Sequence, residues 1–392
     1  MAHLLDLAGC QVAAICPTGH PIRAVAGVRI HEQQALRPID ALRQAIASRK
    51  PDIIVPGDDR AVTHLHRLHR EGTPAERVLV ERSLGAPEAY SITTSRVKLL
   101  ALAERLGIAT PASRQISTEA DLAGWIEQMP APWVIKLNGY WGGMGVRIAS
   151  TPARAIAAFR KLSRDNNGFA AVRRAVMFRD PSWLADNLQG NEREISVQAH
   201  IKGAAADLTM FCWNGEMIAA IAAEGVSFLG ENQPCTMVRL SDRPEFFEAG
   251  RKLARALKLS GFYGLDFMIE EASGKALLIE MNPRVTRLAN LRLQDGRDLL
   301  GAAIEALSGI ASEPPLSVPA GALVAHFPLA WQAGKDDPRL AEAFIDAPWD
   351  EPALIAAMLA PAWPERSLLA RASARSIRSK KQLTGLFQRF AK

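Results

Sequence analysis

The residues best suited to chemistry lie together near position 280, where polar side chains alternate with apolar ones. Residues 262–284 read FYGLDFMIEEASGKALLIEMNPR, and a serine–glycine pair in the middle predicts a turn between two strands. Asp266 falls on the first strand, and Glu280 and Asn282 fall on one face of the second, because side chains two residues apart in a strand point the same way. Two carboxylates and an amide oxygen make an oxygen-only ligand set, which Mg²⁺ prefers, with Mn²⁺ as an alternative.

An arginine follows this set on the same strand. Arg284 lies two residues after Asn282, and the intervening proline stiffens the chain. A guanidinium group there could hold a phosphoryl group through two hydrogen bonds. A solvated hairpin with ordinary surface charges is the alternative, but it explains poorly why Glu280, Asn282 and Arg284 alternate beside an apolar run.

A second motif, WVIKLNGYWGGMGV at residues 133–146, joins a strand to a glycine-rich loop. Lys136 lies near the end of the strand, and the loop that follows contains Gly139, Gly142, Gly143 and Gly145. Glycines let backbone N–H groups turn inward around an anion, and the lysine adds a full positive charge. This is not a Walker A motif, because no G-K-[ST] follows. The pattern indicates a phosphate site; a glycine-rich hairpin without a ligand is the alternative.

The elements that must position these motifs follow from hydrophobic spacing. Residues 194–201 alternate as a strand, and Asn214-Gly215 predicts a tight hairpin turn between two further strands. Capping residues and apolar spacing predict helices over 95–106, 118–129 and 242–259, the last with a capping box that begins at Asp242, and another helix that opens at Thr151-Pro152.

The N-terminal part indicates an α/β unit. Residues 11–16 and 52–55 are short apolar runs that predict buried parallel strands, and 39–48 has helical spacing. Asp58 and Asp59 follow the second run, at the strand end where open parallel sheets usually bind ligands. A doubly wound unit normally opens with a strand and a helix, whereas the first residues here have the pattern of a helix end followed by a strand, so a late-assigned start and a truncated first strand are the two alternatives.

Composition sets the class of protein. The chain has 392 residues, 48% of them hydrophobic and 22% charged, which excludes a disordered or fibrous chain. Its four cysteines form no C-x-x-C pair, which excludes a disulfide scaffold and a cysteine zinc site and indicates a reducing, cytoplasmic location. No signal peptide or membrane-spanning run is expected.

The net charge of +6 belongs to the C-terminal tail. Residues 363–392 contain eight basic residues and one acidic residue, in a basic stripe followed by an apolar stripe at helical spacing. An amphipathic helix that docks on its own domain is one interpretation. Contact with an acidic partner or a membrane surface is the other; no nucleic-acid-binding motif is present.

Other polar residues carry weaker indications. His64, His66 and His69 cluster on one expected helix, but no acid or cysteine completes a metal ligand set, so we expect a solvated helix face. Arg287 could add to a phosphate site or form an ion pair with Asp295.

With these motifs in order, the sequence resembles the ATP-grasp superfamily. IEMNPR at 279–284, after LDF at 265–267, is similar to the superfamily's metal-binding segment, and 136–146 is similar to its phosphate-covering loop. The asparagine–proline–arginine tripeptide is typical of the carbamoyl-phosphate synthase-like branch. The resemblance covers roughly residues 1–310.

The resemblance implies a role for each matching position. Asp266, Glu280 and Asn282 match the metal ligands, and Arg284 matches the arginine that stabilises the transferred phosphoryl group. The nucleotide-binding positions match Arg96 (with Lys98 as an alternative), Lys136, Gly142, Gly143, Gly145, Gln198 and Asp207. Gln198 replaces an acid common among relatives. The segment before Asp207 departs from the usual pattern, which puts its ribose contact in doubt.

The resemblance also implies the architecture. We expect an α/β and α+β protein, with a pre-ATP-grasp α/β domain over 1–89, a two-lobed ATP-grasp domain over 90–310 and a C-terminal extension over 311–392.

The activity implied is that of a ligase that uses ATP and Mg²⁺ to join a small-molecule carboxylate to an amine or thiol through an acyl phosphate. A non-catalytic ATP-binding regulatory protein and an enzyme that phosphorylates bicarbonate or carbamate are the alternatives. A single ATP-grasp unit argues against full carbamoyl-phosphate synthesis. The sequence leaves the substrates and the oligomeric state open, a homodimer included.

Overall fold

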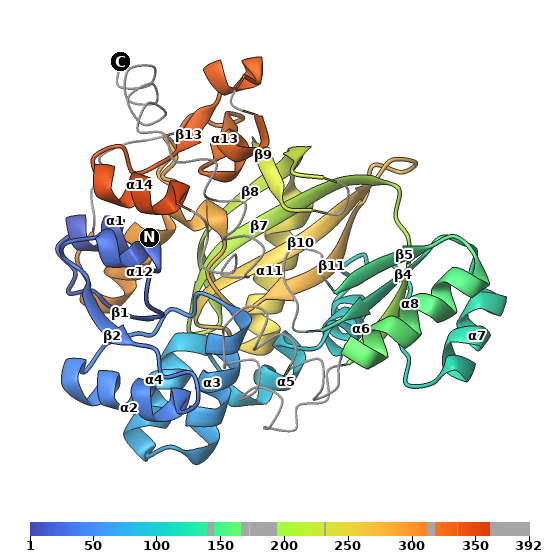
Figure 1. The fold of residues 1–392 in the computed structure, drawn as a ribbon, viewed down its shortest axis with the longest axis horizontal. Coiled ribbons are helices and arrows are strands. Elements are labelled where there is room, and N and C mark those ends of the chain that lie inside the picture. The colour runs from blue at the N-terminus through green and yellow to red at the C-terminus, as the bar shows by residue number, and fades with distance from the viewer. Residues whose placement is uncertain are drawn as a thin grey trace. The chain divides into compact units, whose positions relative to one another are not determined.

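A computed structural model describes residues 1–138, 145–165, 172, 194–230, 233–311, 318–334 and 336–360. The chain divides into two compact units. The smaller comprises Met1–Lys50 and the described residues from Ala347 onward, and the larger comprises Pro51–Arg164 with Glu192–Asp346. The mixed α/β architecture expected from the sequence is confirmed (Figure 1). The domain boundaries at residues 89 and 310 stay predictions, and the basic tail lies outside the described residues.

The smaller unit joins the N-terminal segment to residues near position 350. Two parallel strands, β1 (Ala13–Cys16) and β2 (Arg29–Glu32), pair in register and confirm the parallel strand predicted over 11–16. The predicted burial of that strand is wrong, since Ile15 is 37% exposed. Leu354 of the C-terminal helix packs with Val25 and Val28 in the core of this unit. His3 Nε2 lies 2.8 Å from Asp350 Oδ2, across 347 residues of sequence. The helical elements of the unit are α1 (Ala2–Leu7), η1 (Pro21–Ala24), α2 (Pro38–Arg49) and α14 (Pro352–Leu359).

A seven-stranded sheet dominates the larger unit, in the order β11-β10-β7-β8-β9-β12-β13. Both predicted hairpins are present, and the left-handed φ angles of Asn214 (51°) and Gly215 (87°) make the tight turn between β7 and β8. The strands are β7 (Gly203–Trp213), β8 (Glu216–Phe228), β9 (Cys235–Ser241), β10 (Gly261–Glu270), β11 (Ala276–Asn282), β12 (Leu323–His326) and β13 (Phe344–Asp346).

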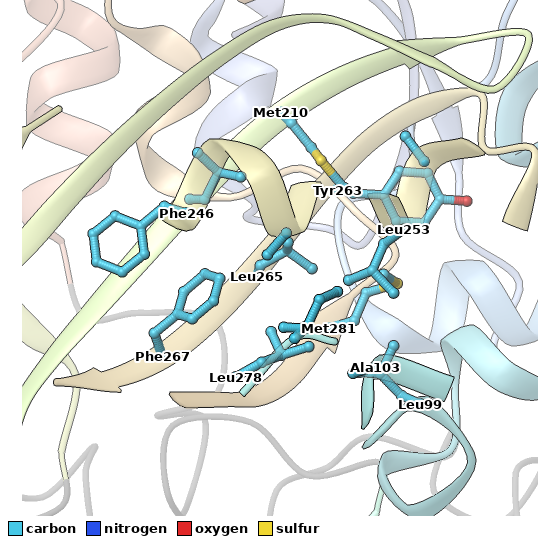
Figure 2. Packing of buried hydrophobic residues seen from close by; sticks show 14 of the residues in the cluster. Leu99, Ala103, Met210, Phe246, Leu253, Tyr263, Leu265, Phe267, Leu278 and Met281 are labelled. Carbon is cyan, nitrogen blue, oxygen red and sulfur yellow. The ribbon is translucent and has the colours of Figure 1, made fainter. Parts of the chain in front are cut away.

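Helix α11 (Pro244–Leu257) covers one face of this sheet and forms the main core (Figure 2). Phe246 of the helix packs on Phe267 of β10, with ring centroids 4.8 Å apart. Leu99, from α6 (Arg96–Arg105), joins the same cluster. The capping box predicted at Asp242 is wrong: the helix begins one residue later, with Arg243 as its N-cap and Pro244 at its first position, and the Arg243 side chain has no acceptor atom with which to cap it.

A four-stranded sheet, in the order β3-β6-β4-β5, forms a second core in the larger unit. The predicted helix over 118–129 is α7 (Glu119–Gln128), and Thr118 caps it reciprocally with Asp121. Trp125 of α7 and Phe159 of α8 pack together in this core. The other elements are β3 (Ser113–Gln115), β4 (Trp133–Leu137), β5 (Val146–Ala149), β6 (Ile195–Ala199) and α8 (Pro152–Asp165).

Residues 51–95 differ from the expected α/β pattern. The strand predicted over 52–55 is wrong: this segment pairs with no described strand, and Ile54 N donates instead to the Ser83 hydroxyl at 2.9 Å. Helical elements follow it, namely α3 (Asp59–Glu71), α4 (Pro74–Leu84), η2 (Pro87–Ala89) and α5 (Tyr90–Thr93). Further along the chain, η3 (Arg287–Asn290), α12 (Leu299–Ser308), α13 (Leu329–Gly334) and η4 (Pro338–Ala341) complete the described elements.

The histidines of α3 are not a solvated face. His66 stacks on Tyr90 with ring centroids 4.3 Å apart, and burial lowers the pKa of His66 to about 4. His69 Nε2 lies 2.8 Å from Glu81 Oε1 of α4. The cluster therefore packs α3 against its neighbours. Throughout the described part of the chain, every helix is too short or too polar to cross a bilayer.

Replacing Phe246 by alanine tests the main core. Phe246 is fully buried, so Phe246→Ala should lower the free energy of unfolding by about 3–5 kcal/mol through lost burial and a residual cavity. A guanidinium chloride titration followed by circular dichroism measures the change. Phe228→Ala is the matched control, because Phe228 is 43% exposed and should cost less than about 1 kcal/mol. Equal losses for the two variants would contradict this packing.

Candidate active site

The β10–β11 hairpin brings the three predicted metal ligands together. Asp266 and Glu280 are directly opposed in the strand register, and Asn282 opposes Gly264 two pairs further on. Asn282 Nδ2 donates to Asp266 Oδ2 at 3.2 Å. Loss of hydration, followed by the negative charge of Glu280, raises the pKa of Asp266 to about 6. This part of the site is therefore crowded with negative charge.

Asp207 extends the carboxylates into a row across three strands. It is the register partner of Asp266 on β7, so Glu280, Asp266 and Asp207 lie side by side on β11, β10 and β7. Loss of hydration and the charge of Asp266 raise the pKa of Asp207 to about 7, and Arg287 opposes that rise. The sequence did not reveal this row, because the register between β7 and β10 joins residues far apart in the chain. The ribose contact of Asp207 stays a prediction.

The chemistry of these donors fits a hard divalent cation. No three His, Cys, Asp or Glu side chains converge closely enough to hold a metal by themselves among the described residues. Asp266, Glu280 and Asn282 supply oxygen atoms only, and a cation beside them would relieve the repulsion that raises the pKa of Asp266. A Mg²⁺ ion held here would complete its coordination with water and phosphate oxygens, as it commonly does.

Arg284 faces this cluster and has three hydrogen-bond contacts. Its Nη2 donates to Asn282 Oδ1 at 3.0 Å, and its Nε donates to Asp59 Oδ1 at 2.9 Å. Within the described part of the chain, its Nη1 makes only a long contact of 3.4 Å with the carbonyl oxygen of Val285. Asp59 was noted in the sequence as lying at a strand end, but its contact with Arg284 was not predicted.

Two further cations reach the row from other elements. Arg96 opens α6; its Nη2 forms an ion pair with Glu280, and its Nη1 donates to Asn138 Oδ1 at 2.7 Å. Lys136 is buried on β4, and its pKa falls to about 8, first because burial removes hydration and then because Arg96 repels it. The structure thus brings Arg96, Lys136 and Glu280 together, whereas Lys98 is exposed.

A glutamate that the sequence did not single out supports Arg96. Glu194 Oε2 accepts from Ser95 Oγ at 2.7 Å and from Asn138 Nδ2 at 2.8 Å. Ser95 also caps α6, since its hydroxyl accepts from Lys98 N. Glu194 therefore connects the start of α6 to the end of β4, and the sequence held no motif that would have marked it.

The remaining predicted residues are placed only in part. Gly142 and Gly143 lie outside the described residues. Gly145 is buried, and its carbonyl oxygen accepts from Leu137 N at 2.9 Å. Gln198 is buried on β6, opposite Val134 in the register. The nucleotide contacts proposed for these positions stay predictions.

Arg287 does not pair with Asp295. Its Nη1 donates to the carbonyl oxygen of Cys235 at 2.9 Å, and Arg297 is the ion-pair partner of Asp295. The reason is local, because Asp295 is only two residues from Arg297 and also accepts from its backbone N–H. The expectation of an Arg287–Asp295 pair is therefore wrong.

Part of the chain that contains these residues matches the model of a known protein family. Residues 186–287 match the family model of the ATP-grasp domain. This range contains Asp207, Asp266, Glu280, Asn282 and Arg284, and it confirms the resemblance seen in the sequence. Residues 186–287 of the chain therefore match an ATP-grasp domain.

Solved structures share the fold at low sequence identity. The biotin carboxylase domain of 2-oxoglutarate carboxylase from Hydrogenobacter thermophilus, in complex with MgADP, ADP and bicarbonate, matches with a TM-score of 0.55 and 12% identity over 80% of this chain and 67% of that one. N5-carboxyaminoimidazole synthetase from Staphylococcus aureus, complexed with ADP, matches with a TM-score of 0.55 and 13% identity over 82% of this chain and 78% of that one. An L-amino acid ligase from Bacillus licheniformis matches with a TM-score of 0.51 and 14% identity over 78% of this chain and 70% of that one. At these identities the likeness shows the fold alone.

The depressed pKa of Lys136 predicts how nucleotide binding depends on pH. A phosphate binds the protonated amine, so the affinity for Mg·ADP should fall as pH rises through about 8, by up to about tenfold between pH 7.5 and 9. Isothermal titration calorimetry measures the dissociation constant at each pH. In Lys136→Arg the side chain stays protonated, so this dependence should vanish. The same dependence in both proteins would rule out Lys136 as its origin.

Proposed function

We propose that this protein is an ATP- and Mg²⁺-dependent ligase that activates a carboxylate as an acyl phosphate and transfers the acyl group to an amine or thiol. The observation that carries this proposal is that oxygen donors on the β10–β11 hairpin meet positively charged groups from that hairpin and from α6 and β4. Asp266, Glu280 and Asn282 supply oxygen donors, while Arg96, Lys136 and Arg284 supply positive charge. The ATP-grasp match over 186–287 supports the same conclusion.

In the first step a carboxylate oxygen of the substrate attacks the γ-phosphorus of ATP. The new bond joins that oxygen to phosphorus, the bond to the β–γ bridging oxygen breaks, and ADP leaves with that electron pair. Lys136 and Arg96 bind the phosphate oxygens, and Arg284 offsets the charge that spreads over the transferred group. Mg²⁺ bound by Asp266, Glu280 and Asn282 would screen the phosphate charge and orient the transferred group.

In the second step the nucleophile attacks the acyl carbon, and phosphate leaves. The acyl phosphate hydrolyses in water, so the site must exclude solvent while it waits for the nucleophile. The glycine-rich loop after Lys136 is the segment we assign to this task. No general base is assigned.

A bicarbonate-phosphorylating enzyme is the second candidate. It is favoured by the Hydrogenobacter thermophilus relative, whose structure contains MgADP and bicarbonate. The L-amino acid ligase relative favours the carboxylate–amine reaction instead. The two candidates share the first step and differ in whether ADP release needs a nucleophile.

The activity test is ADP release in the presence of Mg²⁺, ATP and a panel of carboxylates that includes bicarbonate, each with and without amines and thiols. We expect release that requires both a carboxylate and a nucleophile. Glu280→Ala should reduce the rate by about 100-fold or more, because it removes a metal ligand. Release with bicarbonate alone would favour the second candidate.

Glu271→Ala is the matched control for this variant. Glu271 lies in the turn between β10 and β11, is exposed, and forms a surface ion pair with Lys202. Such pairs contribute little to stability, so the control should retain full activity. Nucleotide binding without ADP release across the whole panel would instead indicate the non-catalytic alternative.

A further inference from the structure

The arginine assigned to the phosphoryl group is held by a residue outside the ATP-grasp match. Asp59 accepts a hydrogen bond from Arg284 Nε at 2.9 Å, across 225 residues of sequence. Both side chains are largely shielded, with 21% of Arg284 and 30% of Asp59 exposed. A second contact joins the same segments, since Val285 N donates to the carbonyl oxygen of Pro56 at 3.1 Å.

Asp59 is itself fixed by the start of a helix. It is the first residue of α3, and the Asp58 side chain caps that helix by accepting from Ala61 N at 2.7 Å. The Thr63 hydroxyl donates to the carbonyl oxygen of Asp59 at 3.1 Å. The carboxylate therefore extends from a well-defined backbone position and can hold its partner in one orientation.

The hydrogen bonds of Arg284 determine which donor remains available. Nε is bound to Asp59 and Nη2 to Asn282, so the plane of the guanidinium group is fixed by two partners on different elements. Among the residues that the structure describes, Nη1 has only its long contact with Val285. A donor aligned in advance contributes most to phosphoryl transfer, because it needs no reorganisation during the reaction.

We propose that Asp59 is a positioning residue for Arg284: its carboxylate orients the guanidinium group so that Nη1 can reach the transferred phosphoryl group. This inference rests on the function proposed above. The negative charge of Asp59 by itself would repel a phosphoryl group nearby. Asp59 therefore helps through the oxygen atom that accepts the hydrogen bond from Arg284 Nε, and not through its charge. Asparagine supplies a similar acceptor without the charge, which makes the idea testable.

The first experiment observes Arg284 directly and requires no activity. In a ¹H–¹⁵N spectrum of arginine Nε–H groups, the signal of Arg284 is assigned as the one that Arg284→Ala removes. Asp59→Ala should shift this signal and accelerate its exchange with water, whereas Asp59→Asn and the neighbouring control Asp58→Asn should preserve slow exchange. An unchanged signal in Asp59→Ala would overturn the proposal.

The second experiment measures the consequence for the phosphoryl site. Mg·ADP with aluminium fluoride mimics a phosphoryl group in transfer, and calorimetry compares its affinity with that of Mg·ADP alone. Arg284→Ala and Asp59→Ala should each weaken the aluminium fluoride complex by about tenfold or more, with Mg·ADP affinity nearly unchanged. Asp59→Asn and Asp58→Asn should stay close to the wild type, and thermal melting of each variant checks that it is folded.

The outcomes separate the two proposals. If Asp59→Asn is as weak as Asp59→Ala, the charge of Asp59 matters rather than its acceptor, and positioning is overturned. Wild-type affinity in Asp59→Ala would overturn it as well. If the wild-type protein binds no Mg·ADP, the nucleotide function fails, and the spectrum of Arg284 still decides whether Asp59 orients it.

Discussion

Loss of hydration at a row of neighbouring carboxylates is the constraint on which the charged contacts of the larger unit depend. Glu280, Asp266 and Asp207 occupy adjacent positions on three neighbouring strands, and the raised pKa values of Asp266 and Asp207 reflect how poorly that row is hydrated. Removing charged groups from water is unfavourable unless opposite charges replace the lost hydration. Arg96 meets this need at one end of the row, and Arg284 meets it beside Asn282.

Each of these arginines depends in turn on an element from elsewhere in the chain. Arg96 is held through Asn138, which Glu194 holds from the start of β6. Arg284 is held by Asp59 at the start of α3. The hairpin therefore carries the reactive groups, but the four-stranded sheet and the helices of residues 59–93 determine where their counter-charges lie. Binding of a nucleotide and a metal would replace some of these contacts with new ones. Because the arginines already offset part of the negative charge of the carboxylate row, binding would change the net charge of the site less than it would for the row alone.

The hairpin chemistry could be predicted from the sequence because it is local. A turn fixes the register of Asp266 and Glu280, and the period of two along a strand puts Asn282 on the same face. The contacts of Asp207, Asp59 and Glu194 could not be predicted, since they join residues through tertiary packing that no short pattern encodes. The failed strand at 52–55 has the same origin, because an apolar run becomes a strand only where a partner strand is available.

The pairing of the two ends of the described chain affects the order in which the protein can be assembled. Val25 and Val28 share their core with Leu354, so the smaller unit cannot complete that core until the ribosome has synthesised the whole of the larger one. Pro51–Arg164 and Glu192–Asp346, by contrast, are all available by then. Because domains generally fold as units during synthesis, the larger unit has the opportunity to fold first, before the N-terminal fifty residues gain their Leu354 partner. The core of the smaller unit is therefore completed late in synthesis, after every residue of the larger unit has been made.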